Sequence, residues 1–179
     1  MDHAANGYKS TILTADGLYL DFLKPDPAVI TIEAIARGLA NTCRFAGQCK
    51  RFYSVAEHSV YVSRLVPPEL AIQGLLHDAA EAFIGDMPKP LKVLLPDYQA
   101  FETVIEGAIF GKFGFSSLHP DVKHADKVML KTEQHQIMRN QDGWHYTENV
   151  QPADLEVYCF PAQTAYDMFM FRAETLGLI

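Results

Sequence analysis

A set of histidine and acidic residues, spread over about seventy positions of the chain, has the composition of a divalent-metal site. Its members are His58, the adjacent pair His77 and Asp78, then Glu81, Asp86 and Asp126. Imidazole nitrogens and carboxylate oxygens are ligands that zinc and related divalent ions take in proteins. An ion held in this way activates water as a nucleophile near neutral pH. The residues therefore predict a metal-dependent hydrolytic site.

The residues around the histidine–aspartate pair have a spacing that suits such a site. On a helix, His77 and Glu81 stand at positions i and i+4, and Asp78 and Glu81 at i and i+3, so all three share one wall. Glu81 then lies one turn beyond two adjacent ligands, where its carboxylate reaches a bound water rather than the ion. An ordinary solvated polar face is the alternative interpretation of this spacing.

Two further residues of ligand type face the interior by their periodicity. Asp126 lies on the apolar stripe of its segment, at i+4 from Val122 and i−3 from Met129. A buried carboxylate is costly unless it is paired or binds a metal, so a salt bridge to Lys or Arg is the alternative to a ligand role. His58 lies on the apolar side of its own segment, where a histidine can also be a satisfied core residue. Three helices that each direct a ligand-type residue inward favour the metal site.

The elements expected to position these residues are almost all helical. Turn residues 15–17 predict a short β-hairpin within residues 8–24, and prolines at 25 and 27 then break the chain. Caps and apolar periodicity predict helices over about 31–41, from about 55, and over about 69–84, 90–95, 97–113, 120–139 and 162–176. Residues 140–160 show little periodicity and predict a long loop. The expected fold class is therefore all-α with a small N-terminal hairpin.

The bulk composition bounds the class of protein. The chain has 179 residues, 49% hydrophobic and 21% charged, as expected of one soluble globular domain over 1–179. Its apolar runs are too short for a membrane span and it opens without a signal segment, which favours the cytoplasm. A net charge of −7 argues against broad nucleic-acid binding but allows a small anionic substrate. The three cysteines predict neither a disulfide framework nor a zinc ribbon.

The order and types of the motif residues resemble a known enzyme superfamily. Four of them are similar to the H…HD…D signature of the HD-domain metal-dependent phosphohydrolases: His58, His77, Asp78 and Asp126. Glu81, Asp86 and the stretch 85–92 resemble the bacterial 5′-deoxynucleotidase-like and small dNTP triphosphohydrolase group of that superfamily. The resemblance covers about residues 32–137, the expected HD core, and leaves the hairpin and residues 140–179 unmatched. It implies an HD-type helical bundle.

The resemblance also implies roles for these residues. It assigns one divalent ion to four ligands: His58, His77, Asp78 and Asp126. Mixed histidine and carboxylate ligation is compatible with Mn, Co, Zn, Fe, Ni or Mg, so the sequence does not choose the metal. Glu81 is implied to orient or deprotonate the attacking water. Asp86 is implied to position the phosphate end of the substrate or to assist the leaving group.

Basic and aromatic residues near the motif are candidates for substrate contact. Arg44 can grip a phosphate through its forked donors, with Lys89 or Lys92 as auxiliary charges. Related enzymes usually carry Arg-Trp before the first histidine, whereas here Phe45 follows Arg44 and the spacing to His58 is one residue shorter. In that group the aromatic lies near the sugar and helps exclude ribose, so Phe45 leaves the preference for deoxynucleotides open.

The resemblance implies hydrolysis of nucleotides, most directly release of phosphate from deoxynucleoside monophosphates by a 5′-nucleotidase. A deoxynucleoside triphosphate triphosphohydrolase would use the same ligands and release triphosphate. A non-catalytic HD module that binds metal or nucleotide is an alternative from a different class. The expected partners are a small-molecule nucleotide and a second copy of the chain in a dimer or higher homo-oligomer, with no nucleic acid and no membrane.

Overall fold

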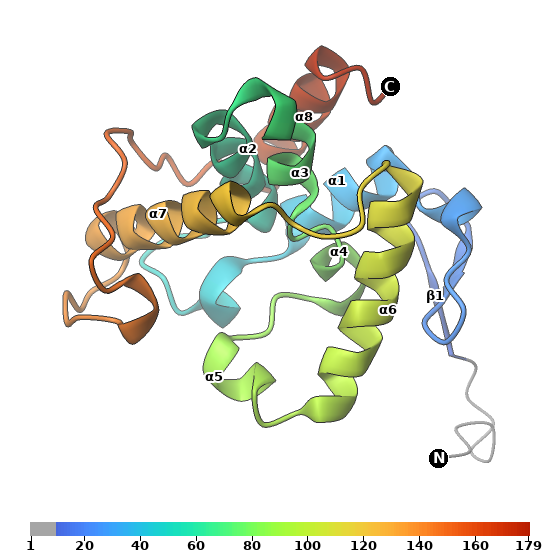
Figure 1. Ribbon diagram of the computed structural model, residues 1–179, viewed down its shortest axis with the longest axis horizontal. Helices are drawn as coiled ribbons and strands as arrows, with labels where there is room; N and C mark the ends of the chain where they lie inside the picture. Colours follow the sequence, from blue (N-terminus) through green and yellow to red (C-terminus); the bar gives the residue numbers. More distant parts are fainter. Residues whose placement is uncertain (1–9) are drawn as a thin grey trace.

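The computed structural model describes residues 10–179, and their architecture is mostly helical with one small sheet (Figure 1). The α-helices are α1 Ile32–Asn41, α2 Val55–Leu65, α3 Ala71–Leu76, α4 Glu81–Ile84, α5 Lys89–Lys92, α6 Pro96–Lys112, α7 Pro120–Ile137 and α8 Ala162–Thr175. Short 3-10 turns precede α1 at η2 Pro27–Val29 and lie between later helices at η3 Arg44–Gly47, η4 Pro68–Leu70 and η5 His145–Thr147. The expectation of a mainly helical protein with a small hairpin is confirmed.

The hairpin consists of β1, Thr11–Leu13, and β2, Tyr19–Asp21, paired antiparallel with Ile12 opposite Leu20. Its turn contains Gly17 with a φ of 79°, a conformation that glycine adopts without steric cost. Residues 8 and 9 of the expected hairpin lie outside the described residues. The hairpin and α7 lie toward opposite sides of the molecule (Figure 1).

Side-chain caps begin two helices where the sequence predicts them. Thr31 Oγ1 accepts the N–H of Ala34 at 2.9 Å at the start of α1, and Ser54 Oγ accepts the N–H of Glu57 at 3.1 Å at the start of α2. Ser54 and Glu57 have the spacing of a capping box, in which the Glu side chain would bond back to the N–H of Ser54. The Glu57 carboxylate instead accepts the N–H groups of residues 159 and 160 at 3.1 and 2.8 Å, which ties the segment before α8 to α2.

Helix α2 lies between two hydrophobic clusters, and residues 55–63 of it are all buried. The larger cluster joins α2 to α1, α3, α6 and α8. The smaller one packs α2 against α7 and includes Tyr53, Val122 and Met129. A helix buried on all sides must direct its polar side chains into the interior, and His58 is one of them.

The prediction of a single helix over residues 69–84 is wrong. The structure has η4, α3 and α4, and residues 77–80 between the two helices wind more tightly. Their hydrogen bonds span three residues, with the N–H of Ala79 on Leu76 O at 3.1 Å and that of Glu81 on Asp78 O at 3.0 Å. A regular α-helix separates consecutive side chains by about 100°. The altered winding accompanies a geometry in which the neighbouring side chains of His77 and Asp78 meet at one point.

Other boundaries differ by a few residues. The short helix expected over about 90–95 is α5, Lys89–Lys92, and α7 ends at Ile137 rather than near 139. The long loop expected over 140–160 is irregular apart from η5. Within residues 10–179, no helix combines the length and apolar composition that crossing a membrane requires.

Candidate metal centre

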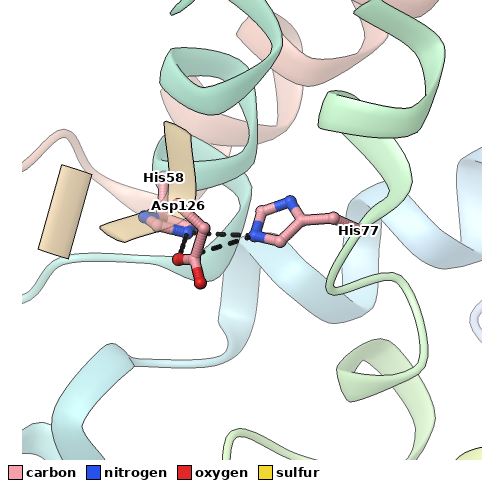
Figure 2. A group of neighbouring side chains, drawn as sticks. All are labelled: His58, His77 and Asp126. Carbon is pink, nitrogen blue, oxygen red and sulfur yellow. Dashed lines mark hydrogen bonds and ion pairs between the residues drawn. The ribbon is translucent and has the colours of Figure 1, made fainter. Parts of the chain in front are cut away.

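Three elements bring ligand-type side chains to one point. Figure 2 shows His58 from α2, His77 from the end of α3 and Asp126 from α7 directed toward one another. His58 Nε2 lies 3.2 Å from His77 Nε2 and 3.2 Å from Asp126 Oδ1, and the distance from His77 Nε2 to Asp126 Oδ1 is 3.9 Å. These atoms are close enough together to bind a single ion. The structure thus brings together three of the four residues that the sequence predicted as metal ligands.

Asp78 completes the predicted set. Its Oδ2 lies 3.0 Å from His77 Nε2 and 3.6 Å from His58 Nε2. The two histidines are buried, whereas 22% of the Asp78 side chain and 39% of the Asp126 side chain are exposed. The carboxylates therefore form the open side of the cluster, from which water or a substrate can reach it.

The partners of the histidines fix which ring nitrogens face the cluster. Glu133 Oε1 lies 2.6 Å from His58 Nδ1, and Gly74 O lies 2.9 Å from His77 Nδ1. Both partners are acceptors, so each Nδ1 carries the proton in the neutral ring. The Nε2 lone pairs then face each other and two carboxylates, so every atom directed to the centre of the cluster can donate an electron pair to a metal ion. Such a donor set fits a divalent ion, and the outer acceptors are those typical of metal-bound histidines.

Protonation of His58 is what balances these charges in the absence of an ion. Burial and Arg44 oppose that proton, but Glu133 and Asp126 outweigh them and raise the pKa of His58 to about 9. Burial alone would raise the pKa of Asp78, yet its interactions with His77, His58 and Arg44 hold it well below its ordinary value. The hydrogen bond from His58 likewise lowers the pKa of Asp126 despite burial. The site thus has a strong preference for positive charge at its centre.

Glu133 is a site residue that the sequence reasoning missed. It is fully buried on α7, accepts a hydrogen bond from Tyr53 Oη at 2.9 Å and pairs with Arg44 Nη2 at 3.2 Å. Those contacts lower its pKa although burial acts in the opposite direction. Glu133 lies at i+7 from Asp126 and i+4 from Met129, on the same apolar stripe. The stripe that singled out Asp126 could therefore have indicated Glu133 as well.

Arg44, expected as a phosphate contact, lies beside the cluster but is already paired. Its Nη1 is 3.4 Å from Asp78 Oδ2, and its other end binds Glu133. Burial opposes its charge, but Glu133 and Asp78 outweigh burial and raise the pKa of the guanidinium. Arg44 therefore links a predicted metal ligand to the carboxylate that orients His58.

Asp86 and Phe45, both expected near the substrate, contact each other. Phe45 has a φ of 57° in η3, and its N–H donates to Asp86 Oδ2 at 3.1 Å. A left-handed conformation is unfavourable for a phenylalanine, so this hydrogen bond helps to hold the turn. Asp86 thus anchors the turn that carries Arg44 and Phe45.

Glu81 begins α4 and differs from the other buried acids of the site. It is buried, and its Oε2 has no hydrogen-bond partner within the described part of the chain. Burial, followed by repulsion from Asp78 and Asp86, raises the pKa of Glu81 well above its ordinary value. A buried carboxyl with an unused oxygen and raised basicity is suited to accept a proton.

The lysines expected to assist the substrate differ in their surroundings. Lys92 Nζ pairs with Glu102 Oε1 at 2.5 Å, and its charge also acts on Glu81. Lys89 is exposed on α5. A further acid that the sequence did not single out, Glu106 of α6, lies close enough for the charge of Asp78 to act on it. Burial and Glu102 raise the pKa of Glu106 to about 7.

These features define a mostly helical protein with a histidine–carboxylate cluster of the kind that holds a divalent ion. The chain belongs to the family of the "uncharacterized protein YfdR" of Escherichia coli (strain K12), with 41% identity over 172 residues, 94% of this chain and 96% of the relative. It is also similar to the "uncharacterized protein RCAP_rcc00048" of Rhodobacter capsulatus, with 36% identity over 136 residues, 68% of this chain and 69% of that protein. No family model matches the chain.

Proposed function

We propose that this protein is a divalent-metal-dependent phosphohydrolase of the HD-domain type that releases phosphate from deoxynucleoside 5′-monophosphates. One observation carries the proposal, namely the convergence on a single point of four residues whose types and order match the HD signature: His58, His77, Asp78 and Asp126. The resemblance to that superfamily supplies the nucleotide substrate.

The four side chains of the cluster indicate how an ion would be held. His58 and His77 would bind through Nε2, kept in orientation by Glu133 and by the carbonyl of residue 74, and Asp78 and Asp126 would bind from the open side. The chemistry that a divalent ion supplies in such a site is a lowered pKa of coordinated water, from ~15.7 toward ~7, and neutralisation of phosphoryl charge.

Glu81 is the residue that we assign to proton transfer. Its unpartnered Oε2 is available to accept the proton of the attacking water, and its raised pKa makes it a stronger base than an exposed carboxylate. Arg44 places a permanent positive charge beside Asp78, where it would meet a phosphate bound at the cluster. Asp86 acts through the turn that it anchors and so positions Arg44 and Phe45.

The test is a substrate panel of ribo- and deoxynucleoside mono- and triphosphates with Mn, Co, Zn or Mg, with the products identified by chromatography. The expected result is inorganic phosphate from deoxynucleoside monophosphates. Intact triphosphate from a deoxynucleoside triphosphate would replace the nucleotidase with a triphosphohydrolase on the same site. If the metal is bound and no nucleotide of the panel is hydrolysed, the proposed nucleotide hydrolysis is overturned and a non-catalytic binding module is favoured.

A further inference from the structure

Trp144 is the single tryptophan of the chain, and it lies next to the predicted substrate region although it comes from the C-terminal loop. Its ring contacts that of Phe45, with the ring centroids 6.1 Å apart and the planes inclined at 53°. Both side chains are partly exposed. The pair therefore offers an aromatic surface to a ligand without being hidden in the core.

A series of contacts leads from the metal cluster to this pair. Arg44 Nη1 lies 3.4 Å from Asp78 Oδ2, and the Arg44 guanidinium carbon lies 5.3 Å from the centroid of the Phe45 ring, which in turn contacts Trp144. The site thus runs from ligands to a fixed positive charge and then to two aromatic rings. A nucleotide has the same order of groups, from phosphate through sugar to base.

We propose that Trp144, which lies beyond Phe45 as seen from Arg44, contacts the base of the nucleotide and is a specificity-determining residue. This inference rests on the proposed nucleotide hydrolysis and extends it to a residue outside the segment that resembles the HD core. Aromatic faces bind bases of any kind, because every base has a π-face. Trp144 therefore selects for the presence of a base rather than for one particular base.

Trp144 is held in place before any ligand binds. Its carbonyl accepts the N–H of Thr147 at 2.9 Å and the hydroxyl of the same residue at 3.2 Å, and Thr147 is buried. Gln134 Nε2 of α7 donates to Asp142 O at 2.5 Å, just before Trp144. Figure 1 shows the orange segment after α7 running back alongside that helix. Helix α7 thus positions Asp126 and the loop that carries Trp144, which lowers the entropy cost of binding.

The test compares Trp144→Ala and Trp144→Phe with the control Tyr146→Ala, an exposed aromatic of the same turn η5. kcat and KM are measured with a deoxynucleoside monophosphate and with 2-deoxyribose 5-phosphate, which lacks the base. We expect Trp144→Ala to raise KM for the nucleotide roughly 5- to 100-fold, with no change for the sugar phosphate. The KM of Trp144→Phe for the nucleotide should lie between those of Trp144→Ala and the wild type, and the KM of Tyr146→Ala should equal that of the wild type.

A second readout uses the wild-type protein and does not depend on any variant folding. Because Trp144 is the single tryptophan, its fluorescence reports on this site alone, and we expect a saturable change with the nucleotide but not with 2-deoxyribose 5-phosphate. Nucleotide hydrolysis with no emission change and an unaltered KM in Trp144→Ala would overturn the base contact and leave the proposed function intact. An equal rise in KM in Tyr146→Ala would also overturn it.

Failure of the proposed enzyme activity gives a different result from failure of the base contact. A saturable emission change without hydrolysis of any nucleotide would support the base contact and overturn the proposed enzyme. Neither hydrolysis nor an emission change would overturn both.

Discussion

The two sides of the histidine–carboxylate cluster differ in how completely their buried polar groups are paired. On the α7 side, the Glu133 carboxylate is engaged by His58, Tyr53 and Arg44. On the α4 side, Glu81 is also buried, but its Oε2 has no partner among the described residues and nearby carboxylates repel its charge. Buried polar groups are normally satisfied, so an exception calls for a reason. The paired side maintains the geometry of the cluster, and we expect the unpaired side to supply the group that reacts.

Loss of a ligand on the open side should have the largest effect, because it removes the centre that both sides serve. We expect Asp78→Ala to lose bound metal and phosphate release together, measured by metal analysis of the purified protein and by phosphate assay. Asp97→Ala, an exposed acid in the first turn of α6, is the control and should behave as wild type. Full activity in Asp78→Ala would remove Asp78 from the ligand set.

The unpaired side is tested by Glu81→Gln, which keeps the shape of the side chain and removes its basicity. The variant should keep its metal while kcat falls about 10²- to 10⁴-fold, as for loss of a general base. Glu106→Gln is the matched comparison, since burial and Glu102 raise the pKa of Glu106 to about 7. We expect the larger loss in Glu81→Gln, and a reversed order would move the role of the base to Glu106.

The paired side is tested by Glu133→Gln, which weakens the acceptor that orients His58. We expect the metal dissociation constant to rise about 10- to 100-fold, with kcat at saturating metal close to wild type. Calorimetric titration with Zn²⁺ measures the first quantity. Glu57→Gln is the control, because Glu57 is equally buried on α2 but binds the backbone of residues 159 and 160. It should lower stability without changing metal affinity, and equal effects would contradict the assigned role of Glu133.

Metal affinity should also depend on pH. His58 has a pKa of about 9 without the ion, so the ion must displace a proton at neutral pH. Affinity should therefore rise by up to tenfold per pH unit from neutrality and level off near pH 9, as titrations at several pH values would show. Independence from pH over this interval would contradict proton displacement from His58.

The same raised pKa affects stability with the opposite sign. In the metal-free protein, the contribution of His58 to stability is complete below its ordinary pKa of 6.5 and is lost as the pH rises through about 9. Thermal unfolding with and without Zn²⁺ should therefore diverge as the pH increases. In Glu133→Gln, which removes a charge that raises this pKa, the divergence should begin at lower pH.

Residue types and periodicity were sufficient to predict where the cluster would form. His58 and Asp126 lie on apolar faces of their helices, which made the interior their expected location, and the adjacent His77 and Asp78 follow from one short motif. Periodicity gave no warning that the helix around that motif would be broken, because residues 77–80 keep helical composition and change only their hydrogen bonding. Glu133 was within reach of the same reasoning, since it shares the stripe of Asp126.

The sequence by itself determined the ligand types, the caps at Thr31 and Ser54, the hairpin turn and the extents of most helices. These features depend on neighbours within a few residues, so local patterns record them. The tertiary structure alone decided that Glu133 orients His58, that Arg44 links Asp78 to Glu133 and that Trp144 meets Phe45. The residues of the polar pairs among these are separated by 34 to 89 positions in the sequence. These pairs exist only because elements distant in the sequence, among them η3, α2 and α7, pack together in the folded protein.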